Sequence, residues 1–155
     1  MFEWLETTPV AIWVGESLWG YPIMLGAHVV GLAIVVGLFV MRDLRLLGMF
    51  PGISYASLDS LRNLGWTGFV INAVSGCFLF SSQASFFIEN TAFLLKISMI
   101  FLAAIFAAII QNQLRDHAVD WDDQGRATGN LRLMAVVSTS LWLGAIIAGR
   151  LVAYL

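Results

Sequence analysis

Three ionisable side chains lie within otherwise uncharged, apolar stretches of the chain: His28, Lys96 and Arg150. An ionisable group inside a membrane span is energetically costly, so each of the three is a candidate functional residue. A neutral imidazole nitrogen is a good axial ligand for haem iron. Lysine and arginine pair well with carboxylates such as the haem propionates. The three residue types therefore predict a haem b-binding site, with His28 on the iron and Lys96 and Arg150 on the propionates.

The depths of these side chains in the expected spans agree. His28 lies about 8 residues, or ~12 Å, inside the first span. Lys96 and Arg150 each lie about 5 residues, or ~8 Å, from the same side. Gly31 follows His28 by three residues, so the two share a helix face, and a glycine there would leave room for a macrocycle. Phenylalanines offer an aromatic lining: Phe69, Phe78, Phe80, Phe86, Phe87 and Phe93.

A second axial ligand is harder to assign. The only other histidine, His117, falls in a linker on the opposite side of the expected membrane, so it cannot share an iron with His28 in one subunit. The iron would be five-coordinate, be completed by a methionine such as Met99, or be shared between subunits. Because four short spans enclose a haem poorly, we expect a homo-oligomer. An electron carrier would also need a redox partner protein.

Two other interpretations use the same residues. Met24 and His28 lie four residues apart on one helix face, and Met99 lies at a comparable depth. Thioether and imidazole ligands suit Cu(I), so copper is a minority alternative. In the other interpretation the chain is a cofactor-free structural or transport subunit. His28 would then relay protons or form a packing hydrogen bond, and the two cations would extend to the lipid headgroups.

The composition indicates a membrane protein. Hydrophobic residues make up 59% of the 155 residues and charged residues 12%, and the mean hydropathy is +0.85. A bilayer-spanning helix needs about 20 mostly apolar residues, and four stretches qualify: 19–41, 65–87, 91–114 and 133–155. We therefore predict one all-α membrane domain over residues 1–155, an up-down bundle of four transmembrane helices. Residues 2–18 mix apolar and acidic side chains around Pro9, which predicts a broken helix in the outer interface.

The basic residues gather in two linkers: Arg42, Arg45 and Arg62 in the first, and Arg115, Arg126 and Arg132 in the second. The positive-inside rule places these linkers in the cytoplasm and both termini outside, as in a multi-pass protein of a bacterial inner membrane. The aspartate-rich linker from Asp116 to Asn130 predicts a solvated loop. Arg42, Asp43 and Arg45 end the first span, where they could dock a partner, form a local ion pair or anchor in the headgroups.

Other classes of function find less support. The net charge is −2 and no basic run is present, which argues against nucleic-acid binding. The single cysteine, Cys77, lies in an apolar stretch and is expected to pack there. The spans contain no nucleophile–base pair, phosphate-binding loop or carboxylate dyad, so we expect no hydrolytic or transfer chemistry. The sequence leaves open whether the chain is an enzyme of another kind.

A set of short motifs extends from Trp4 to Lys96: Trp4-Leu5-Glu6, Thr8-Pro9, Glu16-Ser17-Leu18-Trp19, Tyr21-Pro22, His28, Asp43-Leu44-Arg45-Leu46-Leu47-Gly48, and Ala92-Phe93 followed by Lys96. Together they resemble a family of bacterial four-helix membrane proteins of about this length, which is a domain of unknown function. The resemblance implies the four-span layout and includes His28 and Lys96 in the pattern, but it implies no reaction. The same features are loosely similar to b561-like and copper-resistance-type membrane proteins.

Overall fold

The computed structural model describes residues 2–125, 127 and 129–154, and within them the fold is entirely helical. Four helices are long and apolar enough to cross a membrane, as predicted: α3 (Gly20–Leu46), α5 (Arg62–Ser81), α7 (Thr91–Gln124) and α8 (Gly129–Leu151). Four short helices connect or precede them: α1 (Glu3–Glu6), α2 (Pro9–Glu16), α4 (Tyr55–Ser60) and α6 (Ala84–Glu89).

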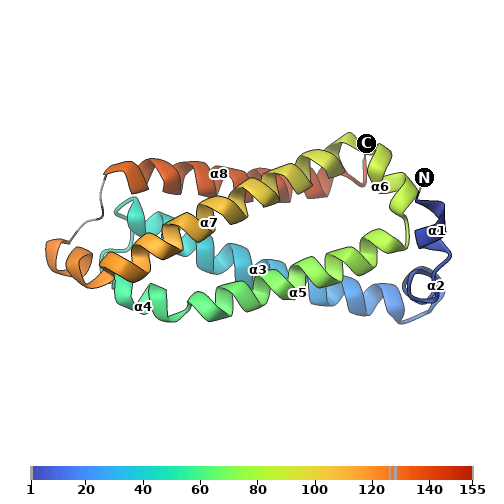
Figure 1. Cartoon of the computed structure of the whole chain (residues 1–155), viewed down its shortest axis with the longest axis horizontal. Coiled ribbons are helices and arrows are strands. Elements are labelled where there is room, and N and C mark those ends of the chain that lie inside the picture. Colours follow the sequence, from blue (N-terminus) through green and yellow to red (C-terminus); the bar gives the residue numbers. More distant parts are fainter. Residues whose placement is uncertain (1, 126, 128, 155) are drawn as a thin grey trace.

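The short helices divide between the two ends of an elongated molecule (Figure 1). Both chain termini lie at the end that carries α1, α2 and α6, which we call the terminal end. The opposite end carries α4 and the turn between α7 and α8, and we call it the α4 end. Consecutive long helices run in opposite directions between these two ends (Figure 1).

Local signals explain where several helices begin and end. The Thr8 hydroxyl caps α2 by accepting a hydrogen bond from Ala11 N at 3.3 Å, and Pro9 occupies the first helical position. The Asn90 side chain caps α7 by accepting from Phe93 N at 3.0 Å. Gly125 ends α7 at φ 69°, a left-handed conformation that glycine adopts without steric cost.

The long helices pack as two pairs, α3 with α5 and α7 with α8, and the pairs meet mainly through α3 and α8 (Figure 1). Gly31 permits the closest approach within the first pair. A Cβ atom at Gly31 would lie 2.6 Å from Asn72 N and 2.9 Å from the Gly68 carbonyl oxygen, so only glycine fits there. Helix α5 makes few contacts with α7 or α8. The two pairs therefore separate on that side of the bundle.

The two largest corrections to the predicted boundaries are at the ends of the second and third spans. In addition, α3 continues to Leu46, past the predicted residue 41, and α8 ends at Leu151. The second span was expected to run to residue 87, but α5 ends at Ser81 and α6 begins separately at Ala84. The Ser81 and Ser82 hydroxyls donate to main-chain carbonyls three residues back, and Gln83 has a non-helical backbone (φ −148°, ψ 42°). Hydroxyls that bond the backbone in this way favour helix ends.

The second correction concerns the linker after the third span. Residues 116–124 were expected in a solvated loop, but they continue α7. The reason is a buried stripe at helical spacing, formed by Leu114, Ala118 and Trp121, which packs against α4. His117 is therefore on a helix; it is exposed, as expected, and its ring stacks on Trp121 with centroids 5.6 Å apart. Arg126 lies outside the described residues.

The segment over residues 2–18 contains two short helices, α1 and α2, which agrees with the broken helix expected around Pro9. It is tied to the terminal end of the bundle, since Glu6 Oε1 accepts a hydrogen bond of 2.7 Å from Ser85 N near the start of α6. Its location in a membrane interface remains a prediction.

A candidate cofactor-binding cavity

A cavity of about 560 Å³ lies between the two helix pairs, where α5 separates from α7 and α8. It occupies the half of the bundle nearer the terminal end, which we call the terminal half. His28, Lys96 and Arg150 all border it. Much of its wall is apolar, with contributions from Leu32, Phe80, Phe93, Ile100 and Ile146. Its volume falls within the range of about 300–1,000 Å³ that is typical of small-molecule and cofactor sites. The structure thus brings together the three ionisable residues that the sequence singled out.

Helix α5 fixes the orientation of the His28 ring. His28 Nδ1 lies 2.9 Å from the Asn72 carbonyl oxygen and 3.2 Å from Ser75 Oγ. A carbonyl oxygen can only accept, so Nδ1 carries the proton in this bond and the neutral ring keeps a lone pair on Nε2. Asn72 also donates from Nδ2 to the His28 carbonyl oxygen at 2.8 Å. Gly76 lets the ring lie against α5, because a Cβ there would be 3.1 Å from His28 Cε1.

The two cations come from the opposite helix pair. Lys96 on α7 is half-buried, and its side chain extends along Gly149 of α8, where a Cβ would lie 3.7 Å from Nζ. Arg150 is exposed and donates from Nη2 to the Tyr154 hydroxyl at 3.0 Å. Within the described part of the chain neither cation forms an ion pair. Both charges are therefore available to an anionic group in the cavity.

Two of the predicted site residues lie elsewhere. Gly31 does not border the cavity, because it faces the α5 backbone and serves helix packing instead of making room for a macrocycle. Met99 is also outside the lining, since its sulfur lies 2.9 Å from where a Cβ would stand on Gly144 of α8. A methionine ligand from this position is therefore not supported.

The residues of the copper interpretation do not converge. Met24 borders a separate groove of about 290 Å³ along α3 and α5, whereas His28 borders the main cavity and Met99 packs on α8. Across the described ranges there is also no group of three or more His, Cys, Asp or Glu side chains placed to hold a metal ion. The geometry does not assemble a thioether–imidazole site within one chain.

Sequence reasoning overlooked Trp142. This residue on α8 borders the cavity, is 2% exposed and packs its ring 5.8 Å from that of Phe39. Its indole Nε1 is buried and has no hydrogen-bond acceptor among the residues described. A usable signal was present, because tryptophan prefers the membrane interface and Trp142 lies well inside the fourth span.

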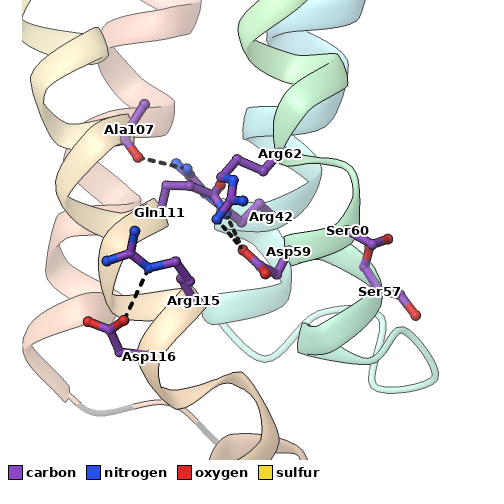
Figure 2. Close-up of polar contacts among 9 residues, drawn as sticks. All are labelled: Arg42, Ser57, Asp59, Ser60, Arg62, Ala107, Gln111, Arg115 and Asp116. Atoms are coloured by element: carbon purple, nitrogen blue, oxygen red, sulfur yellow. Dashed lines mark hydrogen bonds and ion pairs between the residues drawn. The ribbon is translucent and has the colours of Figure 1, made fainter.

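A second polar group lies at the α4 end and includes Arg42 of α3 (Figure 2). Its residues do not border the cavity. Arg42 and Asp43 form a buried ion pair, with Arg42 Nη2 2.7 Å from Asp43 Oδ1, and Arg42 Nη1 donates to the Ala107 carbonyl oxygen at 3.1 Å. The Arg45 guanidinium lies 4.2 Å from the centroid of the Tyr55 ring. The side chains of Arg42, Asp43 and Arg45 are all buried. A local ion pair therefore explains Arg42 and Asp43 better than partner docking or headgroup anchoring.

Comparison of the chain with models of protein families, with curated proteins and with solved structures gives no match.

Proposed function

We propose that the chain is a multi-pass protein of the bacterial inner membrane whose cavity binds haem b, and that it passes single electrons near the outer leaflet. The four long helices would cross the bilayer as an up-down bundle. The distribution of charge supports this orientation, because Arg62, Arg115 and Arg132 lie near the α4 end. The positive-inside rule would place that end in the cytoplasm and the terminal end outside.

The observation that carries the haem proposal is the convergence of His28, Lys96 and Arg150 on one cavity of about 560 Å³. Each residue type matches a part of the cofactor. The apolar walls suit the porphyrin faces, and an imidazole nitrogen suits the iron. The two cations, which have no carboxylate partner among the described residues, suit the propionates. The residues present therefore fit the group.

The surroundings of His28 match those of a metal-binding histidine. Such a histidine usually donates its second ring N–H to a carbonyl or carboxylate, which fixes the ring and raises the basicity of the ligating nitrogen. The Nδ1–Asn72 bond of 2.9 Å does this and leaves Nε2 as the ligand atom. Lys96 and Arg150 would hold the propionates and orient the macrocycle. Bound haem supplies one-electron redox chemistry, at a potential set by its ligands and by burial.

One observation favours a second candidate, a cofactor-free structural subunit. His28 and Asn72 exchange two hydrogen bonds, from Nδ1 to the Asn72 carbonyl and from Asn72 Nδ2 to the His28 carbonyl. Such a reciprocal pair joins α3 to α5 without any ligand. In that case His28 would be a packing residue, and the cavity would be filled by lipid.

An absorption spectrum of the detergent-purified protein from haem-replete cells, oxidised and then reduced with dithionite, tests the proposal. We expect a Soret band and haem b by extraction. His28→Ala should abolish the Soret band. The double variant Lys96→Gln with Arg150→Gln should weaken haem retention. His117→Ala is the matched control, because it removes the other histidine from the exposed surface of the α4 end. A colourless wild-type protein would favour the cofactor-free candidate, and colour that survives His28→Ala would exclude His28 as the ligand.

A further inference from the structure

Trp142 lies across the cavity from His28, at about the same depth in the bundle. His28 follows Gly20, the first residue of α3, by eight residues, and Trp142 precedes Leu151, the last residue of α8, by nine. Both of these helix ends are at the terminal end (Figure 1), so the rise per residue places the two side chains ~12 and ~14 Å from it. They border the cavity from its two different helix pairs. A macrocycle bound to His28 would therefore turn its other face toward Trp142.

The wall formed by α7 and α8 offers no second iron ligand. Lys96 and Arg150 are cations that carry only donors, and the Trp142 indole is likewise only a donor. The other described residues of these two helices that border the cavity are apolar: Phe93, Ile100, Ala145, Ile146 and Gly149. The Tyr21 hydroxyl also borders the cavity, but Tyr21 precedes His28 by seven residues and so shares its face of α3. A haem held by His28 would therefore have an open position on the side of Trp142.

The Trp142 indole has an unused hydrogen-bond donor. Its side chain is 2% exposed, and Nε1 has no acceptor among the described residues. Buried polar groups almost always have a partner in the protein or in a bound molecule. Because Trp142 borders the cavity, a molecule bound there can supply the acceptor. Ala145 and Gly149 follow on the same face of α8, and their small side chains leave room beside the indole.

We propose that the haem site also binds a small neutral diatomic molecule, such as carbon monoxide, nitric oxide or dioxygen, and that Trp142 Nε1 donates a hydrogen bond to it. This inference rests on the proposed function, since the iron is the group that holds the molecule. Donors and access on the open side of a haem decide between ligand binding and simple electron transfer. Such molecules bind ferrous iron most tightly, so occupancy would stabilise the reduced state and slow release of its electron.

A purely structural role for Trp142 would need only its ring. Trp142 and Trp66 both pack on Phe39, with ring centroids 5.8 and 5.6 Å away, but Trp66 does not border the cavity. Replacement of either tryptophan by phenylalanine keeps an aromatic ring and removes the indole N–H. Trp142→Phe and Trp66→Phe are therefore matched variants, and only the first should change a molecule bound in the cavity.

Binding of carbon monoxide to the detergent-purified, dithionite-reduced protein tests the inference. We expect a reduced spectrum without sharp α and β bands, as for a five-coordinate haem, and a shift of the Soret band when carbon monoxide is added. Infrared spectroscopy then gives the C–O stretching frequency, which falls when a donor polarises the bound molecule. Trp142→Phe should shift this frequency upward, whereas Trp66→Phe should leave it at the wild-type value.

The outcomes separate this inference from the haem proposal. A haem protein whose reduced spectrum has sharp α and β bands and does not change with carbon monoxide would overturn the inference and leave the haem proposal standing. A C–O frequency unchanged in Trp142→Phe would overturn the role of Trp142. A wild-type protein without a Soret band would overturn both proposals together. If Trp142→Phe failed to fold, the spectra of the wild-type protein would still decide whether the iron has an open position.

Discussion

The two ends of the bundle are built in opposite ways. At the α4 end, Leu46, Ile110 and Leu114 are fully buried, and Asp43, Asp59 and Asp122 each accept hydrogen bonds from neighbouring groups. In the terminal half the helix pairs enclose a cavity of about 560 Å³, bordered by two cations without ion-pair partners in the described residues. The comparison indicates that the α4 end is packed more tightly than the terminal half, so matched substitutions at the two ends should differ in their effect on stability.

The largest loss of stability should come from breaking the buried ion pair at the α4 end. Arg42→Ala leaves the Asp43 carboxylate buried and unpaired, which should lower the free energy of unfolding by about 3–5 kcal/mol. Unfolding by SDS titration in mixed micelles measures this. The double variant Arg42→Ala with Asp43→Ala is the control and should regain much of the loss, because it leaves no unpaired charge. Equal losses in the single and double variants would contradict this account.

A pair of isoleucines compares packing at the two ends directly. Ile110 is fully buried in the α4-end core, so Ile110→Ala should cost about 2–5 kcal/mol. Ile146 borders the cavity and is 39% exposed, so Ile146→Ala should change the free energy of unfolding by less than about 1 kcal/mol. The same titration gives both values. If the two variants lost equal stability, the terminal half would be packed as tightly as the α4 end.

Two glycines of α3 test the helix contact that supports His28. Gly31→Ala would place a methyl group 2.6 Å from Asn72 N and should destabilise the fold by about 1–3 kcal/mol, because α3 and α5 must separate. Separation would also disturb the His28–Asn72 bond, so under the proposed function haem retention should fall together with stability. Gly26→Ala is the control, since nothing lies within 4 Å of its Cβ. Its stability should stay at or slightly above the wild-type value.

A small and local effect is expected where Asp122 fixes α4 to α7. Its Oδ1 accepts from Tyr55 N at 2.7 Å and its Oδ2 from Ala56 N at 3.1 Å, which caps the start of α4. Asp122→Ala should cost about 1 kcal/mol, as loss of a helix cap does. Hydrogen exchange should report faster exchange of the α4 amides while the amides around the cavity stay unchanged. Uniform acceleration in both halves would show that the ends are not independent.

Much of the fold could be predicted from the sequence because helix formation in a membrane protein is local. Apolar runs of sufficient length predict spans whatever they contact, and Asn90 and Thr8 mark the helix starts they cap. The depths of His28, Lys96 and Arg150 are also local quantities, since they follow from the rise per residue. For this reason the sequence could indicate that these three side chains lie at similar levels, as their shared cavity requires.

The rest could not be predicted, because it depends on how each helix is rotated about its axis. Gly26 and Gly31 are both glycines of one span, yet only Gly31 meets α5. Met99 was a plausible ligand by depth, but its side chain packs on α8.

The sequence by itself determined that the chain forms four long apolar helices with a histidine and two cations at comparable depths, because these features depend on residue type and spacing. Only the tertiary structure decided that α7 continues through Trp121, that Asn72 orients His28, and that Arg42 and Asp43 lie inside. Each of these depends on a contact with a separate helix: α4 for Trp121, α5 for His28, and α7 and α8 for the ion pair. Such contacts join residues far apart in the chain, so no local pattern specifies them.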